Sequence, residues 1–223
     1  MQNLFSLAPT QNNTTDFITF KNYGVLSHRF TDEELAPVWK EVNELQKDFS
    51  KHDSLKNNNN LAGNIEKEYK LIESNDHLER LITPLVEYYD MYSAYNSSVK
   101  NCTSDKYRLK GSWVNFQKKH EFNPNHNHGG FMSFVIWMKI PYSIENEKQN
   151  LSSINSNANI PGHFQFVYTS ILGETMSHVV PVDANMENTI MVFPAKLMHT
   201  VYPFYTSDDY RISISGNFYF DIS

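Results

Sequence analysis

The sequence has almost no cysteine and no excess of positive charge. Cys102 is the single cysteine among 223 residues, so the chain can form neither an intramolecular disulfide nor a cysteine-based zinc site, which fits a reducing cytoplasm. Lys and Arg number 19 against 25 Asp and Glu, which gives a formal net charge of −6 at pH 7. Because no basic stripe is present to follow a phosphate backbone, we do not expect nucleic acid as the primary ligand.

Long hydrophobic runs are also missing. The longest uncharged apolar run, Phe131 to Met138, is far shorter than the roughly 20 residues that cross a membrane. The first residues, MQNLFSLAPTQNN, lack the basic start and the apolar centre of a secretory signal. We therefore expect a soluble, cytoplasmic protein without a membrane partner. Its 40% hydrophobic and 14% aromatic residues are enough for one folded domain over residues 1–223.

The first hundred residues carry two helical patterns. Thr31 and the acidic residues after it are typical of a helix N-terminus, and apolar residues then recur at helical spacing to about Phe49. A second pattern begins at residues 74–76 and continues to Tyr92, with Pro84 as a site of a kink or a break. We expect residues 1–100 to form a helical support region whose two apolar stripes pack against a core.

Extended patterns replace the helical ones after residue 106. Runs rich in β-branched and aromatic residues predict seven strands: Tyr107–Lys118, Phe131–Ile140, Phe164–Leu172, Ser177–Val182, Thr189–Phe193, Met198–Tyr202 and Arg211–Phe220. This density of short strands predicts an all-β sandwich or barrel over residues 101–223. The polar stretch Ser143–Gly162 is expected to be an exposed loop beside it.

Three of the nine histidines are candidates for a metal site. If the segment from His126 to His128 is extended, both imidazoles point to one face and can meet one ion. The alternative is that they are solvated loop histidines. His199 lies in an apolar, strand-like segment, where a histidine is either hydrogen-bonded in the core or coordinated to a metal.

The last predicted strand has a polar face and an apolar face. Arg211, Ser213, Ser215 and Asn217 share one face, because side chains alternate along a strand. On an outward-facing strand this is ordinary surface alternation. If the polar face points into a barrel, its guanidinium and hydroxyl suit a carboxylate ligand.

Together these residues resemble a known signature. The order His126-x-His128, His199 and Arg211-x-Ser213 is similar to that of the Fe(II)- and 2-oxoglutarate-dependent oxygenases. With the flanking runs SFVIWMKIP and RISISGNFYF, it resembles more closely a branch common in bacteria and phages, in which a histidine takes the carboxylate position. The resemblance implies a double-stranded β-helix, or jelly roll, as the catalytic core, with Fe(II), 2-oxoglutarate and O2 as cofactors.

The resemblance also implies roles for single residues. His126 and His199 match the two histidines of the facial metal triad, and His128 stands in the place of the usual carboxylate. The resemblance leaves open whether His128 binds the metal directly or stands next to a metal bound by the other two histidines and water. Arg211 and Ser213 match the positions that hold the distal carboxylate of 2-oxoglutarate.

Asn115 and Trp137 are further candidates for contact with the cosubstrate. No residue beyond the metal centre needs to act as a catalytic acid or base. The implied reaction hydroxylates an unidentified substrate, a peptidyl residue or a small molecule, while 2-oxoglutarate is decarboxylated to succinate.

Two alternatives remain at this stage. The three histidines could form a zinc or iron site in an enzyme that does not use 2-oxoglutarate. The chain could also be a non-catalytic jelly-roll protein that binds a partner or has a structural role. The sequence does not decide the oligomeric state, and a homodimer is one option.

Overall fold

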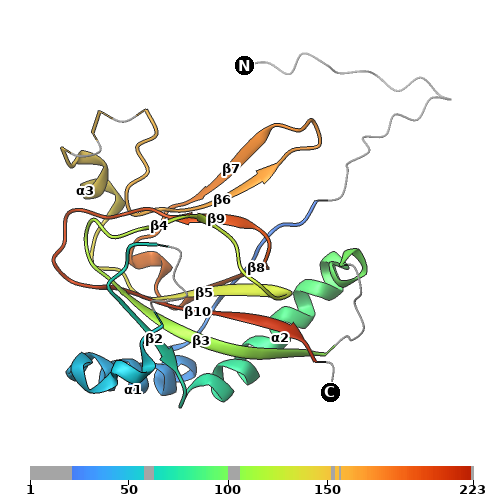
Figure 1. Ribbon diagram of the computed structural model, residues 1–223. Coiled ribbons are helices and arrows are strands. Elements are labelled where there is room, and N and C mark those ends of the chain that lie inside the picture. The colour runs from blue at the N-terminus through green and yellow to red at the C-terminus, as the bar shows by residue number, and fades with distance from the viewer. Residues whose placement is uncertain (1–21, 58–62, 100–105, 152–153, 156, 222–223) are drawn as a thin grey trace.

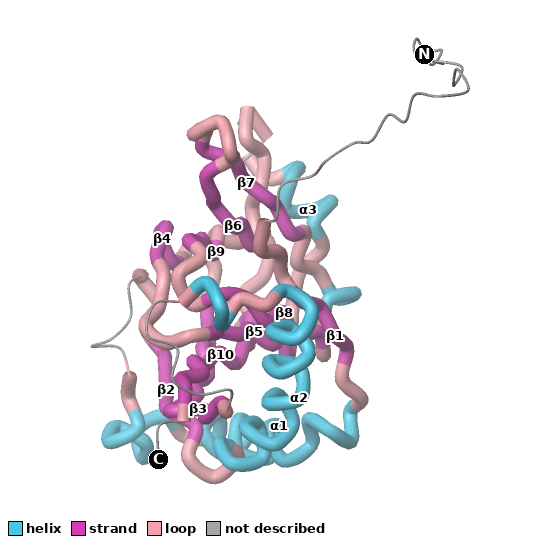
Figure 2. The backbone as a smooth tube through the Cα atoms, turned by 90° about the vertical axis from the view of Figure 1, so that its right-hand side faces the viewer, coloured by secondary structure: helices cyan, strands magenta, loops and turns pink. Residues whose placement is uncertain are grey.

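The protein has three layers, namely a pair of helices, a six-stranded sheet and a four-stranded sheet (Figure 1). The computed structural model describes residues 22–57, 63–99, 106–151, 154–155 and 157–221. The large sheet has the order β1-β8-β5-β10-β3-β2, the small sheet has the order β4-β9-β6-β7, and every pairing is antiparallel. The helices lie under the large sheet, on the side away from the small sheet (Figures 1 and 2).

The helices and strands are numbered in the order in which they occur along the chain. The strands are β1 (Leu26–Arg29), β2 (Lys67–Leu71), β3 (Tyr107–Gln117), β4 (Asn123–His126), β5 (Met132–Lys139), β6 (Phe164–Thr169), β7 (Thr175–Val180), β8 (Thr189–Pro194), β9 (Met198–Val201) and β10 (Arg211–Phe220). The α-helices are α1 (Asp32–Lys47), α2 (Asn75–Ser93) and α3 (Ile144–Gln149), and the short 3-10 segments are η1 (Phe49–Leu55), η3 (Asn96–Ser98) and η4 (Ala184–Met186).

Helix α1 begins with a capping box. The Thr31 hydroxyl accepts a hydrogen bond from the Glu34 backbone N–H at 3.2 Å, and the Glu34 carboxylate accepts one from the Thr31 N–H at 2.8 Å. These bonds satisfy N–H groups that have no partner inside the helix. The predicted stripe of apolar residues on α1 is buried: Leu35, Val38, Val42 and Leu45.

Helix α2 begins where the carboxylate of Glu41, on α1, accepts hydrogen bonds from three consecutive backbone N–H groups, at residues 72–74. Pro84 lies inside α2, which continues as one helix to Ser93. Neither of these helices, nor any other helix among the described residues, combines the length and the apolar character that a membrane span requires.

All seven predicted strands are present, and three further strands were not predicted. Two of them, β1 and β2, come from the first hundred residues and form the two edges of the large sheet. The third is β4, which pairs with β9 at the edge of the small sheet. The N-terminal region therefore supplies sheet edges in addition to helices.

The stretch from Ser143 to Gly162 was expected to be a loop throughout, and this is wrong for its first part. Helix α3 begins after Ser143, whose hydroxyl accepts a hydrogen bond from the Asn146 N–H. Ile144 and Glu147 are buried, and the Glu147 carboxylate accepts the backbone N–H groups of residues 205 and 206 at 2.8 Å. Helix α3 thus anchors the loop that leads into β10.

The two faces of the large sheet pack against different parts of the protein. On the helix side, strands β3, β5, β8 and β10 contribute a continuous apolar layer that includes Val114, Phe116, Ile136, Val192, Ile212 and Ile214. On the other side, β5 and β8 pack Val135, Trp137, Met191 and Phe193 against Phe164 and Phe166 of the small sheet. Polar residues of β10, β3 and β2 line the same cleft. This mainly β architecture of two antiparallel sheets, with supporting helices, confirms the predicted fold class.

Candidate metal centre

Three histidines from two segments of the chain meet in the cleft between the sheets. His126 ends β4, His199 lies opposite it on β9 in the strand register, and His128 follows two residues after β4. One ring nitrogen from each lies within 4.8 Å of the others. The ring centroids are 4.3 Å apart for His126 and His199, and 5.0 Å apart for each pair that includes His128.

His128 lies in the loop that follows β4, because the strand ends at His126. The loop is held by backbone hydrogen bonds from the His128 N–H to the Ala195 carbonyl at 2.9 Å and from the Ala195 N–H to the Phe131 carbonyl at 3.0 Å. Gly130 has φ +99°, and a Cβ there would lie 2.7 Å from the Phe218 carbonyl, so the turn requires glycine.

Backbone carbonyls fix the orientation of two of the rings. Nδ1 of His126 lies 2.7 Å from the Pro124 carbonyl, and Nδ1 of His199 lies 2.9 Å from the Leu197 carbonyl. A carbonyl oxygen can only accept, so Nδ1 carries the proton in both rings and Nε2 keeps a lone pair. This arrangement orients metal-ligating histidines in many proteins.

Burial keeps the cluster uncharged. Burial and the charge of His126 lower the pKa of His199 to about 3, and the same causes lower the pKa of His128 to about 4. Burial also lowers the pKa of His126. His199 is enclosed by Phe164, stacked on its ring at 5.4 Å, and by Phe193 at 5.1 Å. At neutral pH the three imidazoles are therefore in the form that binds metal ions.

All four predicted cosubstrate residues line the same cavity as the histidines. The cavity has a volume of about 620 Å³. Ser213 of β10 lies opposite Asn115 of β3 on one side and Trp137 of β5 on the other, so these three side chains form one row across its floor. Among the described residues, the buried Oδ1 of Asn115 has no hydrogen-bond partner. Such an atom is costly to bury unless a ligand or water satisfies it.

Arg211 begins β10, two residues before Ser213, and is 2% exposed. Its guanidinium donates to the side chains of Gln117 and Tyr142 and to two backbone carbonyls. No carboxylate of the described residues lies within ion-pair distance of it. Sequence reasoning did not single out Gln117, although it shares a face of β3 with Asn115 two residues earlier. No local pattern indicated Tyr142.

A further buried carboxylate lines the cavity on strand β2. Glu68 lies opposite Asn115 in the register and accepts a hydrogen bond from Asn57 at 2.6 Å. Burial raises the pKa of Glu68 to about 7. The charged run KEYKL gave no sign that this residue would be buried.

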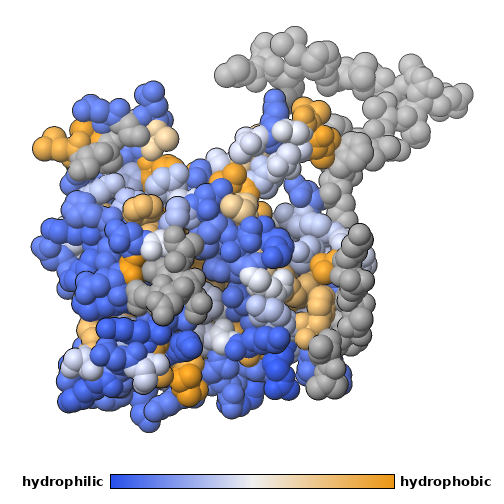
Figure 3. Space-filling model, in the orientation of Figure 1, coloured by the Kyte–Doolittle hydropathy of each residue, from blue (hydrophilic) through white to orange (hydrophobic). Residues whose placement is uncertain are grey.

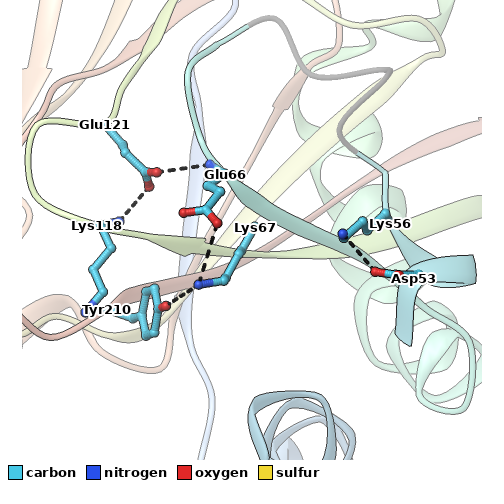
Figure 4. Close-up of polar contacts among 7 residues, drawn as sticks. All are labelled: Asp53, Lys56, Glu66, Lys67, Lys118, Glu121 and Tyr210. Carbon is cyan, nitrogen blue, oxygen red and sulfur yellow. Dashed lines mark hydrogen bonds and ion pairs between the residues drawn. The ribbon is translucent and has the colours of Figure 1, made fainter. Parts of the chain in front are cut away.

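The start of strand β2 is tied to the turn after β3 (Figure 4). The Glu121 carboxylate accepts hydrogen bonds from the backbone N–H groups of Glu66, at 3.0 Å, and of Lys118, at 2.7 Å. Lys67 donates to the Tyr210 hydroxyl at 2.8 Å, next to Arg211. These bonds fix the wall of the cavity around the start of β10.

The sequence and the fold both match known proteins. Residues 111–217 match a family described as "Putative 2OG-Fe(II) oxygenase", and this match contains all three histidines and Arg211. This match places residues 111–217 among the 2OG-Fe(II) oxygenases. A comparison with curated proteins gave no match.

Several solved structures share the fold of this chain at low sequence identity. A prolyl-4-hydroxylase from Pseudomonas putida is 12% identical with a TM-score of 0.52, over 89% of this chain and 94% of its own. A Trichoplax adhaerens prolyl hydroxylase, in complex with a peptide fragment of hypoxia inducible factor, is 14% identical with a TM-score of 0.51, over 89% and 84%. SnoN, a non-heme alpha ketoglutarate dependent epimerase from nogalamycin biosynthesis, is 15% identical with a TM-score of 0.53, over 89% and 77%.

The residues in the cavity suit the cofactors of the 2OG-Fe(II) oxygenases, which are Fe(II), 2-oxoglutarate and O2. The histidine cluster offers three neutral nitrogen donors, and imidazole is a normal ligand of non-haem iron. A buried guanidinium without a carboxylate partner among the described residues suits an acidic cosubstrate. The unpartnered amide oxygen of Asn115 can accept a hydrogen bond from a ligand or a water molecule. The donor chemistry thus fits the cofactors that the family implies.

Proposed function

We propose that this protein is a hydroxylase that couples the oxidation of a C–H bond to the decarboxylation of 2-oxoglutarate. In this proposal His126, His128 and His199 hold the metal, and direct ligation by His128 is part of it. The observation that carries the proposal is the convergence of three ring nitrogens within 4.8 Å, in a cavity that also contains the buried Arg211.

The cosubstrate is assigned to the row of side chains beside the cluster. Arg211 and Ser213 bind its distal carboxylate, while Asn115 and Trp137 contact it from the neighbouring strands. A guanidinium and a hydroxyl on one strand can both donate hydrogen bonds to a carboxylate. Trp137, 3% exposed and packed edge-on against Phe164 at 5.8 Å, excludes water from that side of the cavity.

The reaction consumes a substrate R–H, 2-oxoglutarate and O2, and it yields R–OH, succinate and CO2. Bound Fe(II) supplies the redox chemistry that links the two oxidations. The protein's own residues supply neutral nitrogen donors, a binding site for the cosubstrate and a cavity wall that restricts water. No side chain has to remove a proton in this scheme, so we assign no catalytic residue beyond the metal centre.

We propose a peptidyl residue as the substrate. The cavity that holds the buried Arg211 and His128 is also lined by Lys70 and Lys110, two exposed residues on the neighbouring strands β2 and β3. A cleft that opens along two strands can admit an extended chain, and the Trichoplax enzyme of similar fold is described with a bound peptide fragment. SnoN is described as an epimerase of nogalamycin biosynthesis, so small molecules form the competing class.

The function is tested by anaerobic addition of Fe(II) and 2-oxoglutarate, followed by O2. We expect a weak visible charge-transfer band from the iron chelate, and succinate after O2 is admitted. The Arg211→Ala variant should bind 2-oxoglutarate at least a hundredfold more weakly, since losing one partner of a buried charge pair costs about 3 kcal/mol or more. Arg80→Ala, on the exposed face of α2, is the matched control and should behave as the wild type.

Metal binding is tested separately by its effect on stability. Mn(II) at about one hundred times its Kd should stabilise the wild type by about 3 kcal/mol, by mass action. His126→Ala and His199→Ala should lose this effect, and His178→Ala, on the exposed part of β7, should keep it. A wild-type protein that binds metal but gives neither the band nor succinate would favour a three-histidine enzyme that does not use 2-oxoglutarate.

The substrate class is tested by the release of succinate. A peptide library and a small-metabolite library are screened for compounds that raise succinate formation above the uncoupled rate, and products are checked for the mass of one added oxygen atom. Stimulation by peptides with oxygen incorporated at a residue supports the proposal. Stimulation by small metabolites alone would replace it.

A further inference from the structure

Every hydrogen-bond donor of the Arg211 guanidinium already has an acceptor. Nε and Nη2 both donate to Oε1 of Gln117, at 3.1 and 2.5 Å. Nη1 donates to the Tyr142 hydroxyl at 2.6 Å and to the Gly162 carbonyl at 2.9 Å, and Nη2 donates also to the Tyr202 carbonyl at 3.0 Å. A guanidinium has five N–H groups, and all five bonds go to uncharged oxygens. A carboxylate that binds Arg211 must therefore take the place of one of these acceptors.

Three of the four acceptors are fixed in place. The Gly162 N–H donates a hydrogen bond to the Pro203 carbonyl at 2.7 Å, and the Tyr202 N–H donates one to the His163 carbonyl at 3.0 Å. The Tyr142 ring stacks on Phe204 with centroids 4.8 Å apart, and its hydroxyl donates to the Gly162 carbonyl. None of these acceptors lines the cavity that holds the histidines.

Gln117 is the acceptor that faces the cavity. Its side chain lines the cavity together with Arg211, and its single oxygen receives two N–H groups on the Nε–Nη2 edge. This edge is one that carboxylates bind with two parallel hydrogen bonds. The other end of the amide donates to the Glu121 carbonyl at 2.5 Å. Arginine can only donate and a carbonyl can only accept, so the orientation of the amide is settled by its partners.

We propose that the Gln117 amide competes with the distal carboxylate of the keto acid for this edge of Arg211, and so lowers the affinity of the site for dicarboxylic keto acids. The inference rests on the proposed function. A carboxylate is a stronger acceptor for a guanidinium than a neutral amide, so a ligand with a distal carboxylate regains the bonds that Gln117 gives up. A keto acid without a distal carboxylate cannot regain them, and it leaves the contact between Gln117 and Arg211 unchanged.

The test is calorimetric binding of 2-oxoglutarate and of pyruvate to the Mn(II)-loaded protein. Pyruvate carries the keto acid end and lacks the distal carboxylate. With Q117A the competing acceptor is gone, and if Gln117 holds Arg211 nine-tenths of the time, affinity for 2-oxoglutarate should rise about tenfold. With Q117E a carboxylate of the protein stays beside Arg211, and binding of 2-oxoglutarate should fall by a factor of ten or more. Pyruvate affinity should change less than twofold in both variants.

The control is Q149E, which makes the same chemical change at an exposed position of α3 and should bind both keto acids as the wild type does. Thermal unfolding and Mn(II) content show whether each variant is folded and loaded. If Q117E does not fold, Q117A alone decides, because it removes the competitor without adding a charge. Weaker or unchanged binding of 2-oxoglutarate by Q117A would show that Gln117 only supports Arg211, and would overturn the proposal.

Failure of the proposed function gives a different result. In that case the wild-type protein loaded with Mn(II) binds neither keto acid, whatever residue stands at position 117. If the wild type binds 2-oxoglutarate but the affinities of Q117A and Q117E do not differ from it as predicted, the proposed function stands. Only the role of Gln117 is then refuted.

Discussion

The histidine cluster should make the protein lose stability as the pH falls, before any metal is added. His199 has a folded-state pKa of about 3 and His128 one of about 4, against an ordinary value of 6.5. Below pH 6.5 the unfolded chain therefore binds more protons at these positions than the folded chain does. The contribution of these two histidines to the free energy of unfolding is complete above pH 6.5. It is lost as the pH falls toward their folded-state pKa values. Each contributes a slope of about 1 kcal/mol per pH unit.

Glu68 acts in the opposite direction over part of this range. Its folded-state pKa is about 7 against an ordinary value of 4.5, so the folded chain binds the extra proton between these values. Its contribution is complete below pH 4.5 and is lost as the pH rises through 7. Between pH 6.5 and 4.5, the two histidines outweigh the one carboxylate. The wild type should therefore lose at least about 1 kcal/mol per pH unit over this range, because the lowered pKa of His126 acts in the same direction.

The H199Q variant isolates the contribution of the cluster. Urea unfolding is measured at pH 7.5, 6.5, 5.5 and 4.5 in the presence of EDTA, and the free energy of unfolding is plotted against pH for each protein. The slope for H199Q should be smaller than the wild-type slope by about 1 kcal/mol per pH unit below pH 6.5. H178Q makes the same change at an exposed position of β7 and should follow the wild-type slope. Parallel lines for H199Q and the wild type would refute the argument that burial holds this imidazole neutral.

Three other substitutions test the packing that positions the site, each by urea unfolding at pH 7.5. Gly216→Ala would place a Cβ 2.7 Å from the Phe134 ring and should cost roughly 1–3 kcal/mol from overpacking. Thr31→Ala removes the N-cap of α1 and should cost about 1 kcal/mol. Glu147→Gln weakens the bonds to the N–H groups of residues 205 and 206 and should cost about 2–3 kcal/mol; an unchanged midpoint would show that this loop needs no anchor.

The elements that the sequence predicted well are those whose own residues bury a stripe or a face. The apolar spacing of α1 and the alternation of β10 each report directly on what the element packs against. The three missed strands are edge strands, with sequences LSHR, KEYKL and NPNH. Edge strands carry charged residues and proline because these discourage pairing with other chains, so they lack the usual strand pattern. The missed helix α3 has six residues, too few for a helical period to be visible.

The sequence predicted which residues form the candidate site, but it did not predict which of them contact one another. The His-x-His spacing, His199 and the polar face of the last strand pointed to the residues that the structure brings into one cavity. The pairing of His126 opposite His199 depends on the register of two strands more than seventy residues apart, which no local pattern sets. The contact of Arg211 with Gln117 depends likewise on the register between β10 and β3, where the two residues are paired.

The sequence also did not indicate that the tip of the β6–β7 hairpin would be exposed. Ile171 and Leu172 at this tip are 70% and 80% exposed, and apolar atoms gather there in the space-filling view (Figure 3). The hairpin extends from the strand that pairs with β9, which carries His199. The tip therefore belongs to the same small sheet that covers the metal centre.

The alternation that builds the core also decides where a buried charge must lie. Ile212 and Ile214 point to the helices, so Arg211 and Ser213 necessarily point into the cleft. A guanidinium buried there without acceptors would be strongly destabilising, and a permanent carboxylate partner would neutralise it and exclude an acidic ligand. A glutamine avoids both outcomes, because its amide oxygen satisfies two N–H groups without cancelling the charge. Under the proposed function, the residue type at position 117 therefore affects the binding of the acidic cosubstrate together with the arginine that it contacts.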